Sequence, residues 1–222
     1  QLAVEAVAQK QPSLVWGPPG TGKSSTLTAY LLAVVEEALQ GGLAKKILIT
    51  GPNYRAVEVL MHKLFFAFDS NPALSVDLFK IYSRSRPAES FPYEAQPHLN
   101  ARSFRLGQVL DETVLANSLR GPGVSIIGTS AHTIPGIVSP SGRVLAGLFD
   151  LVVIDESSQV PVTLALRPFA ALRASAQVVV AGYPKQMPPV QSLDAPVGAE
   201  HLVGSIHAYI ESRFHVPQSE LL

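Results

Sequence analysis

The sequence predicts an α/β fold in which helices flank a parallel sheet of five to six strands. The first observation is a set of short apolar runs, each with the length of a buried strand. These runs cover residues 13–16, 47–50, 78–82, 124–128, 151–154 and 177–181. The second is that helical patterns follow the first two runs, and strands that alternate with helices are typical of parallel sheets. The third is a glycine-rich stretch at residues 17–24, between the first strand and its helix.

This glycine-rich stretch reads GPPGTGKS. It matches the phosphate-loop pattern G-x-x-x-x-G-K-[ST] at Gly17, Gly22, Lys23 and Ser24. Glycines suit such a loop because they let the backbone N–H groups turn toward a polyphosphate without a Cβ clash. We expect Lys23 to reach the β- and γ-phosphates and the Ser24 hydroxyl to ligate Mg²⁺. The dipole of the following helix also favours the anion.

The elements after the first helix continue the alternation. The strand at residues 47–50 precedes a helix over residues 55–68 with one apolar face. The stretch 69–123 is irregular, with a Pro-rich piece at 86–97 and a predicted helix at 101–119. We therefore expect 69–123 to be a partly helical insertion that projects from the sheet. The other predicted helices cover residues 2–9, 27–38 and 202–214, with one more beginning near residue 162.

A second strong signal is the apolar run 151–154, which ends in Asp155 and Glu156. A buried parallel strand here delivers both carboxylates to the sheet edge that carries the phosphate loop. We expect Asp155 to hold the Mg²⁺ shell and Glu156 to orient or deprotonate the attacking water. The alternative is that they only cap the helix that begins near residue 162. Beyond the last strand, Gln186 is either a γ-phosphate contact or an ordinary polar turn residue.

Composition limits the remaining classes. The chain has 222 residues, 47% of them hydrophobic and 15% charged, so it can bury a core and is not a disordered tail. It contains no cysteine, which excludes disulfides and cysteine zinc sites. Its formal net charge is zero, which disfavours a binder driven by a globally basic surface. No apolar run is long enough to span a bilayer, so we expect a soluble, intracellular protein without a membrane partner.

Three further blocks resemble those of superfamily 1 helicases. Residues 51–58, GPNYRAVE, resemble the A-P-S-N-x-A-V-D block. Residues 154–159, IDESSQ, resemble I-D-E-[AS]-[AST]-Q, and residues 180–190, VAGYPKQMPPV, resemble V-G-D-x-x-Q-L-P-P-V. With the phosphate loop they share order and spacing over nearly the whole chain. The sequence is thus similar to the first RecA-like domain of the group that includes senataxin and the RNA helicase of nonsense-mediated decay.

The resemblance implies an ATP- and Mg²⁺-dependent motor that moves 5′ to 3′ on single-stranded RNA or DNA. It makes Lys23, Glu156 and Gln186 the catalytic residues, and Ser24 and Asp155 the metal ligands. The nucleotide-binding residues that it implies are Gly17, Pro18, Pro19, Gly20, Thr21, Gly22, Lys23, Ser24 and Ser25. The nucleic-acid contacts that it implies are Pro52, Asn53, Tyr54 and Thr129. As an alternative, Asn53 and Thr129 are ordinary turn residues.

The expected organisation is a single RecA-like domain over residues 1–222, cut from a longer chain. A second RecA-like domain of that chain is the implied partner and supplies an arginine finger. Alone, the domain should be a monomer that binds Mg-ATP and hydrolyses it weakly. Tyr183 replaces the Asp usual in the third block and favours a rival interpretation, a nucleotide-gated binding module that does not hydrolyse ATP. An AAA+ remodelling ATPase is a second rival, and the Gln-Met-Pro-Pro sequence at 186–189 argues against it.

Overall fold

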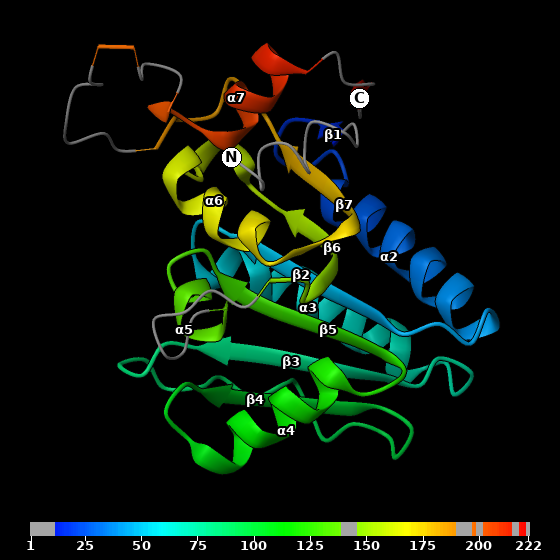
Figure 1. Cartoon of the computed structure of the whole chain (residues 1–222). Coiled ribbons are helices and arrows are strands. Elements are labelled where there is room, and N and C mark those ends of the chain that lie inside the picture. Colours follow the sequence, from blue (N-terminus) through cyan, green and yellow to red (C-terminus); the bar gives the residue numbers. More distant parts are fainter. Residues whose placement is uncertain (1–11, 139–145, 190–196, 199–201, 215–217, 221–222) are drawn as a thin grey trace.

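The centre of the computed structural model is an eight-stranded sheet (Figure 1). The structure describes residues 12–138, 146–189, 197–198, 202–214 and 218–220. The strands run in the order β4-β3-β5-β2-β6-β7-β1-β8, and every neighbouring pair is parallel. Their bounds are β1 Ser13–Trp16, β2 Lys45–Gly51, β3 Val76–Tyr82, β4 Asn100–Arg105, β5 Val124–Ser130, β6 Phe149–Ile154, β7 Leu172–Gly182 and β8 Gln218–Glu220.

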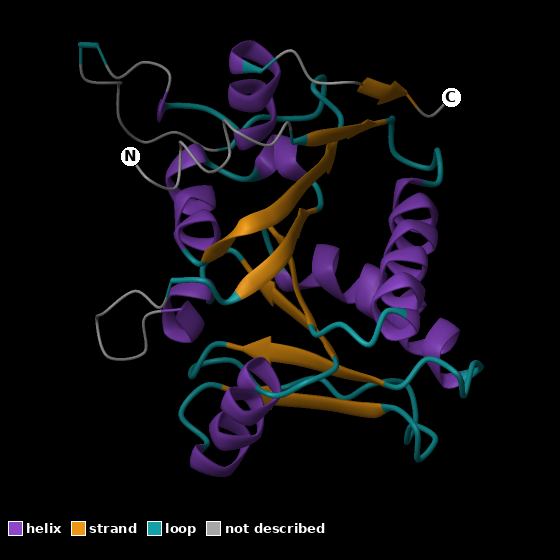
Figure 2. Cartoon of the chain, turned by 45° about the vertical axis from the view of Figure 1, so that its right-hand side comes forward, coloured by secondary structure: helices purple, strands orange, loops and turns teal. Residues whose placement is uncertain are grey.

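Helices cover both faces of this sheet (Figure 2). Successive strand residues point to opposite faces, so in β2 the side chains of Ile47 and Ile49 pack with α2 and α3, whereas Leu48 packs in the cluster on the other face. That second cluster also takes residues from α4, α5, α6 and α7. The bounds are α2 Lys23–Gln40, α3 Tyr54–Asp69, α4 Val109–Arg120, α5 Ile134–Val138, α6 Val162–Ala170 and α7 Ile206–Arg213. The predicted α/β class with a parallel sheet is confirmed.

The sheet has two strands more than the sequence predicted, β4 and β8. Residues 101–105 were expected at the start of a helix, and this prediction is wrong: Asn100–Arg105 pairs with β3, and the helix begins only at Val109. Gly107 separates the two elements in a left-handed conformation, with φ at 95°, that ends the strand and precedes the helix. The final helix is also shorter than expected, because Ser205 caps it by accepting a hydrogen bond from the Ala208 N–H.

The prediction that the segment 69–123 projects from the sheet is wrong. Its strands β3 and β4 extend the sheet at one edge, and α4 covers a face there. Buried Lys46 fixes α4 in place by donating hydrogen bonds to the carbonyls of Ser118 and Gly123 and to the Ser125 hydroxyl, at 2.7, 3.0 and 3.0 Å. The helix predicted for residues 2–9 lies outside the described residues.

Candidate active site

The phosphate loop lies between β1 and α2, as its sequence predicted. The Gly17 N–H bonds the Gly182 carbonyl at 3.3 Å, which ties the start of the loop to the end of β7. Gly20 and Gly22 have φ angles of 88° and 89°, where a side chain would be strained. Gly22 is the N-cap of α2, so the first, unpaired N–H groups of the helix face the region that the loop encloses.

A cavity of about 450 Å³ opens beside this loop. It is lined by Pro19, Gly20, Gly22, Lys23, Ser24, Ser25, Lys63, Asp155, Glu156 and Gln186. The strands β6, β7 and β1 are neighbours in the sheet, so the residues that follow their carboxyl ends meet at one edge. The structure thus brings the loop, the two carboxylates and Gln186 around one space.

The two carboxylates differ in their surroundings. Asp155 is buried, and burial raises the pKa of its carboxyl group to about 6, although a hydrogen bond from the Glu156 N–H at 2.9 Å opposes the rise. Lys23 and Lys63 also lower the pKa of this carboxyl group, since a cation stabilises a buried carboxylate, and the nearby Ser24 hydroxyl adds a second hard oxygen donor. This donor set fits Mg²⁺.

Glu156 has the left-handed backbone conformation, with φ at 48°, and within the described residues it is the one non-glycine residue with positive φ. Such strain is uncommon outside functional sites. The residue directly follows Asp155 at the end of β6 and points a half-buried carboxylate into the cavity. This places an acceptor for a water proton beside the loop.

Lys23 is the cation of the loop. Its ammonium group donates to the carbonyls of Gly17 and Pro18, the latter at 2.9 Å. Burial lowers its pKa, while Asp155 and Glu156 raise it. A lysine held by weak carbonyl partners can transfer its hydrogen bonds to phosphate oxygens, which are stronger, charged acceptors.

The third block is joined to the second through backbone contacts. The Ser158 hydroxyl, in the short 3₁₀ turn η1 (Ser157–Gln159), bonds both the carbonyl and the N–H of Tyr183, at 2.7 and 3.0 Å. The Gln186 N–H in turn bonds the Tyr183 carbonyl at 3.0 Å. Because Tyr183 contributes main-chain groups here, the connection between these blocks does not depend on an aspartate at this position.

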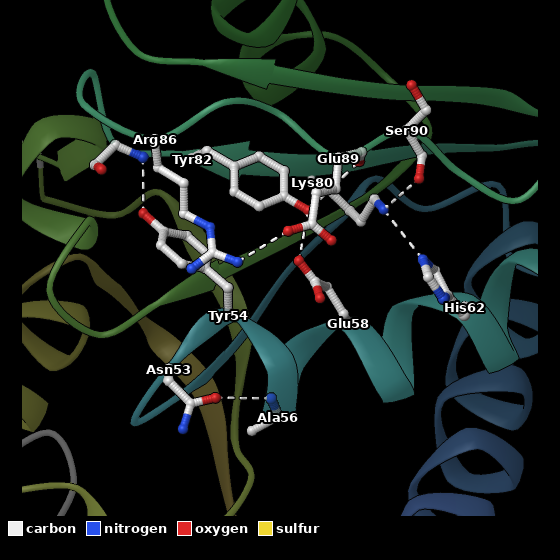
Figure 3. Close-up of polar contacts among 11 residues, drawn as sticks. Asn53, Tyr54, Ala56, Glu58, His62, Lys80, Tyr82, Arg86, Glu89 and Ser90 are labelled. Carbon is white, nitrogen blue, oxygen red and sulfur yellow. Dashed lines mark hydrogen bonds and ion pairs between the residues drawn. The ribbon is translucent and has the colours of Figure 1, made fainter.

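The residues implied as nucleic-acid contacts do not share one environment; Figure 3 shows two of them, Asn53 and Tyr54. Asn53 is exposed, and its side-chain oxygen caps α3 by accepting the Ala56 N–H at 3.0 Å. Tyr54 is half-buried, and its hydroxyl accepts the Ser83 N–H at 2.7 Å and bonds the Thr133 hydroxyl. Pro52 is half-buried beside them.

Thr129 does not fit a side-chain contact with nucleic acid. It is fully buried, and its hydroxyl donates to the Ile81 carbonyl at 2.7 Å. The reason is that β5 continues to Ser130 and pairs there with β2, so Thr129 lies within the sheet rather than in the loop beyond it.

Two basic residues near these sites were not predicted from the sequence. Lys63, on α3, lines the cavity, and the helical pattern of 55–68 gives no signal for it beyond its being a lysine next to an apolar face. Arg86 lies with its guanidinium 4.8 Å from the ring centre of Tyr54, and its side chain is 44% exposed (Figure 3). Arg86 begins the Pro-rich stretch 86–97, which has no helical or strand pattern from which its position could be predicted.

The fold and the cavity define a P-loop NTPase with a RecA-like parallel sheet. Residues 1–192 match the AAA_19 family model, an AAA domain, and the chain belongs to this family. With its helicase relatives, this makes it a RecA-like domain of the superfamily 1 helicase group that includes the RNA helicase of nonsense-mediated decay.

The relatives are much longer proteins. The chain is 26% identical over 203 residues to a Danio rerio protein named as the helicase mov-10-B.1, covering 90% of this chain and 18% of that protein. It is 34% identical over 92 residues to a Regulator of nonsense transcripts 1 homolog of Arabidopsis thaliana, which covers 41% of this chain and 6% of that protein. A solved structure of the Type ISP restriction-modification enzyme LlaGI with a DNA substrate mimic is similar over 82% of this chain and 16% of that chain, at 14% identity and a TM-score of 0.46.

None of the helices in the described residues combines the length and apolar character that crossing a bilayer requires.

Proposed function

We propose that this domain binds Mg-ATP in the cavity beside the phosphate loop and hydrolyses it as the motor of a superfamily 1 helicase. The observation that carries the proposal is the meeting of Lys23, Asp155 and Gln186, from three separate blocks, around one space. Phosphoryl transfer needs positioning and charge stabilisation rather than covalent chemistry from the protein, and this arrangement supplies both.

In this proposal each residue has a distinct task. The loop N–H groups and Lys23 bind the phosphates, while Ser24 and Asp155 hold Mg²⁺, which neutralises charge on the phosphate oxygens. Glu156 orients the attacking water and accepts its proton. Gln186 contacts the terminal phosphate, and its loop is fastened to η1 through Ser158 and Tyr183, so a change at that phosphate reaches the end of β7.

The proposed substrate is single-stranded RNA or DNA, with movement in the 5′-to-3′ direction. The exposed Asn53 at the start of α3 and the exposed Arg86 near it are suited to contacts with a phosphate backbone, which carry no sequence preference. A second RecA-like domain in the longer chain is the proposed source of the arginine finger, worth about 10³ to 10⁵ in rate where one is used.

The test is ATP turnover by the full-length protein, measured with no polymer, with single-stranded RNA and with single-stranded DNA. We expect strong stimulation by one polymer, and a loss of about 10² or more in turnover in Glu156→Gln with Mg-ATP binding preserved. The better polymer identifies the substrate. Equal turnover in wild type and Glu156→Gln would rule out the assigned role of this carboxylate.

A nucleotide-gated binding module is the second candidate, favoured by Tyr183 in place of the usual aspartate. It predicts Mg-ATP binding that changes nucleic-acid affinity with no turnover under any polymer condition. Turnover by the wild-type protein with any polymer would exclude this module. Tyr183→Asp then tests the position itself: a gain of turnover would mean that Tyr183 limits hydrolysis, and an unchanged rate would agree with a role through its backbone groups.

A further inference from the structure

A second lysine enters the proposed nucleotide site from outside the phosphate loop. Lys63 lies on α3, and its ammonium group donates to the Ser25 hydroxyl at 2.8 Å. Its side chain lines the same cavity as Lys23, Asp155 and Glu156. None of the sequence blocks that mark the site contains Lys63.

Helix packing sets the position of Lys63. The apolar side of α3, including Leu60 and Leu64, packs into the cluster that also holds Leu27 and Leu31 of α2. Lys63 is half-buried at the border of this contact, opposite the first turn of α2. Because both helices pack against the sheet, the backbone of Lys63 is held where its ammonium group reaches the phosphate loop.

The charges around the cavity indicate a role for Lys63 in binding an anion. Asp155 and Glu156 face it with two carboxylates, and Lys23 and Lys63 face it with two ammonium groups. Lys63 therefore adds a second positive charge to a site where Lys23 faces two carboxylates, which strengthens the attraction for an anionic polyphosphate. A hydroxyl is also a weaker acceptor for an ammonium group than a phosphate oxygen.

We propose that Lys63 is a second phosphate-binding cation, which exchanges its bond to Ser25 for a bond to the polyphosphate of the bound nucleotide. This inference rests on the proposed function, since it requires a nucleoside triphosphate at the loop. It also assigns two contacts to one helix: Asn53 caps its start, and Lys63 lies ten residues later, about 15 Å along the axis. Nucleotide and nucleic acid are then bound by the two ends of a single rigid stretch.

The experiment is isothermal titration of the full-length protein with a non-hydrolysable Mg-ATP analogue and with Mg-bound inorganic triphosphate. We expect Lys63→Ala to weaken both ligands by about ten- to a hundredfold, the range for one charge-assisted hydrogen bond. Lys63→Arg, which keeps the charge, should stay within about threefold of wild type. Lys45→Ala, at the start of β2 and outside the cavity, is the matched control and should leave both affinities unchanged.

The outcomes separate the two proposals. Wild type that binds no Mg-nucleotide would end the proposed function itself. Wild type that binds, together with Lys63→Ala that binds equally well, would overturn the role of Lys63 and leave the function standing. Thermal unfolding without ligand completes the test: a lower midpoint in Lys63→Ala with unchanged affinity would show that the Lys63–Ser25 bond only joins α3 to α2.

Discussion

At the scale of single residues, His207 connects the segments that carry the site. The Trp16 indole N–H donates to its Nε2 at 2.8 Å, so Nε2 accepts and Nδ1 carries the ring proton. Nδ1 donates to the Ser157 hydroxyl at 2.9 Å, which donates to the Ala181 carbonyl at 2.8 Å. These hydrogen bonds join the end of β1, the start of η1 and the end of β7. The phosphate loop follows β1, Glu156 precedes η1, and the loop with Gln186 follows β7.

Gly182 is required beside this chain. A Cβ at Gly182 would lie 2.5 Å from the Ser157 hydroxyl oxygen, 2.8 Å from that of Ser158 and 3.1 Å from Nδ1 of His207. The close approach explains a glycine at the end of a buried strand, where a larger residue would displace the hydroxyls that hold η1.

The buried imidazole predicts a pH dependence of stability. Burial lowers the pKa of His207 to about 4 from an ordinary value of 6.5. The unfolded chain therefore binds more protons than the folded one between these values, and the stabilisation that the neutral ring gives is lost as pH falls from about 6.5 to about 4. Asp155, whose pKa is raised to about 6, has the opposite effect between 3.8 and 6, so wild type alone would show only the sum.

The measurement is the difference in unfolding free energy between wild type and His207→Gln, followed by chemical denaturation from pH 7.5 to 4. We expect the advantage of wild type to shrink as the pH falls through this window, because the contribution of Asp155 is common to both proteins and cancels. A difference that stays constant with pH would mean that His207 is not kept neutral by burial.

At the scale of elements, α3 links a surface position to the cavity. Asn53 is exposed and also caps this helix, so capping and nucleic-acid contact are confounded in a simple alanine variant. Arg86 lies 4.8 Å from the ring centre of Tyr54 and 6.0 Å from that of Tyr82, and the two rings are 4.9 Å apart, so the three side chains form one cluster beside the start of α3 (Figure 3).

Two variants of Asn53 separate these roles. Asn53→Ala should cost about 1 kcal/mol of stability through the lost cap and should weaken single-strand binding. Asn53→Asp keeps a capping oxygen and should leave stability nearly unchanged, yet its negative charge should reduce affinity for single-stranded RNA or DNA in a fluorescence anisotropy titration. Wild-type affinity in Asn53→Asp would identify Asn53 as a helix cap alone.

The sequence predicted the elements whose chemistry lies in consecutive residues. The phosphate loop and the Asp155-Glu156 strand end are of this kind, and both lie beside the cavity. It missed β4, an edge strand of mixed polarity in which Phe104 alone is buried. It also missed Lys63, because packing of α3 on α2, and not sequence distance, brings it to the loop.

Thr129 illustrates a second limit. The prediction placed it beyond the end of a strand over residues 124–128, but β5 continues to Ser130 because it pairs there with β2, and a local pattern does not reveal such pairing. The same is true of the segment 69–123: its strands β3 and β4 gain their hydrogen bonds from β5 and from each other, which a local pattern cannot reveal.

At the scale of the whole molecule, the proposed ligand should stabilise the entire fold, since the cavity is built by three neighbouring strands. Ligand at about 100 times its Kd adds about 2.7 kcal/mol, which corresponds to roughly 5–10 °C in Tm for a domain of this size. The measurement is thermal unfolding with Mg-ATP, with ATP plus EDTA as one control and Lys23→Ala as another. An equal shift in Lys23→Ala would place the binding outside the phosphate loop.

The order of the strands has a consequence for how the chain acquires its structure. β1 pairs with β7 and β8, so Ser13 meets Val179 and Leu14 meets Gln218. Pairing between residues far apart in the sequence slows folding, because the entropy cost of closing a long loop comes before any stabilising contact forms. During synthesis the phosphate loop emerges long before the strands that hold it, and β2, β3 and β5 can assemble first. Closing of the nucleotide site is then among the last steps of folding, and an unfinished chain cannot yet form it.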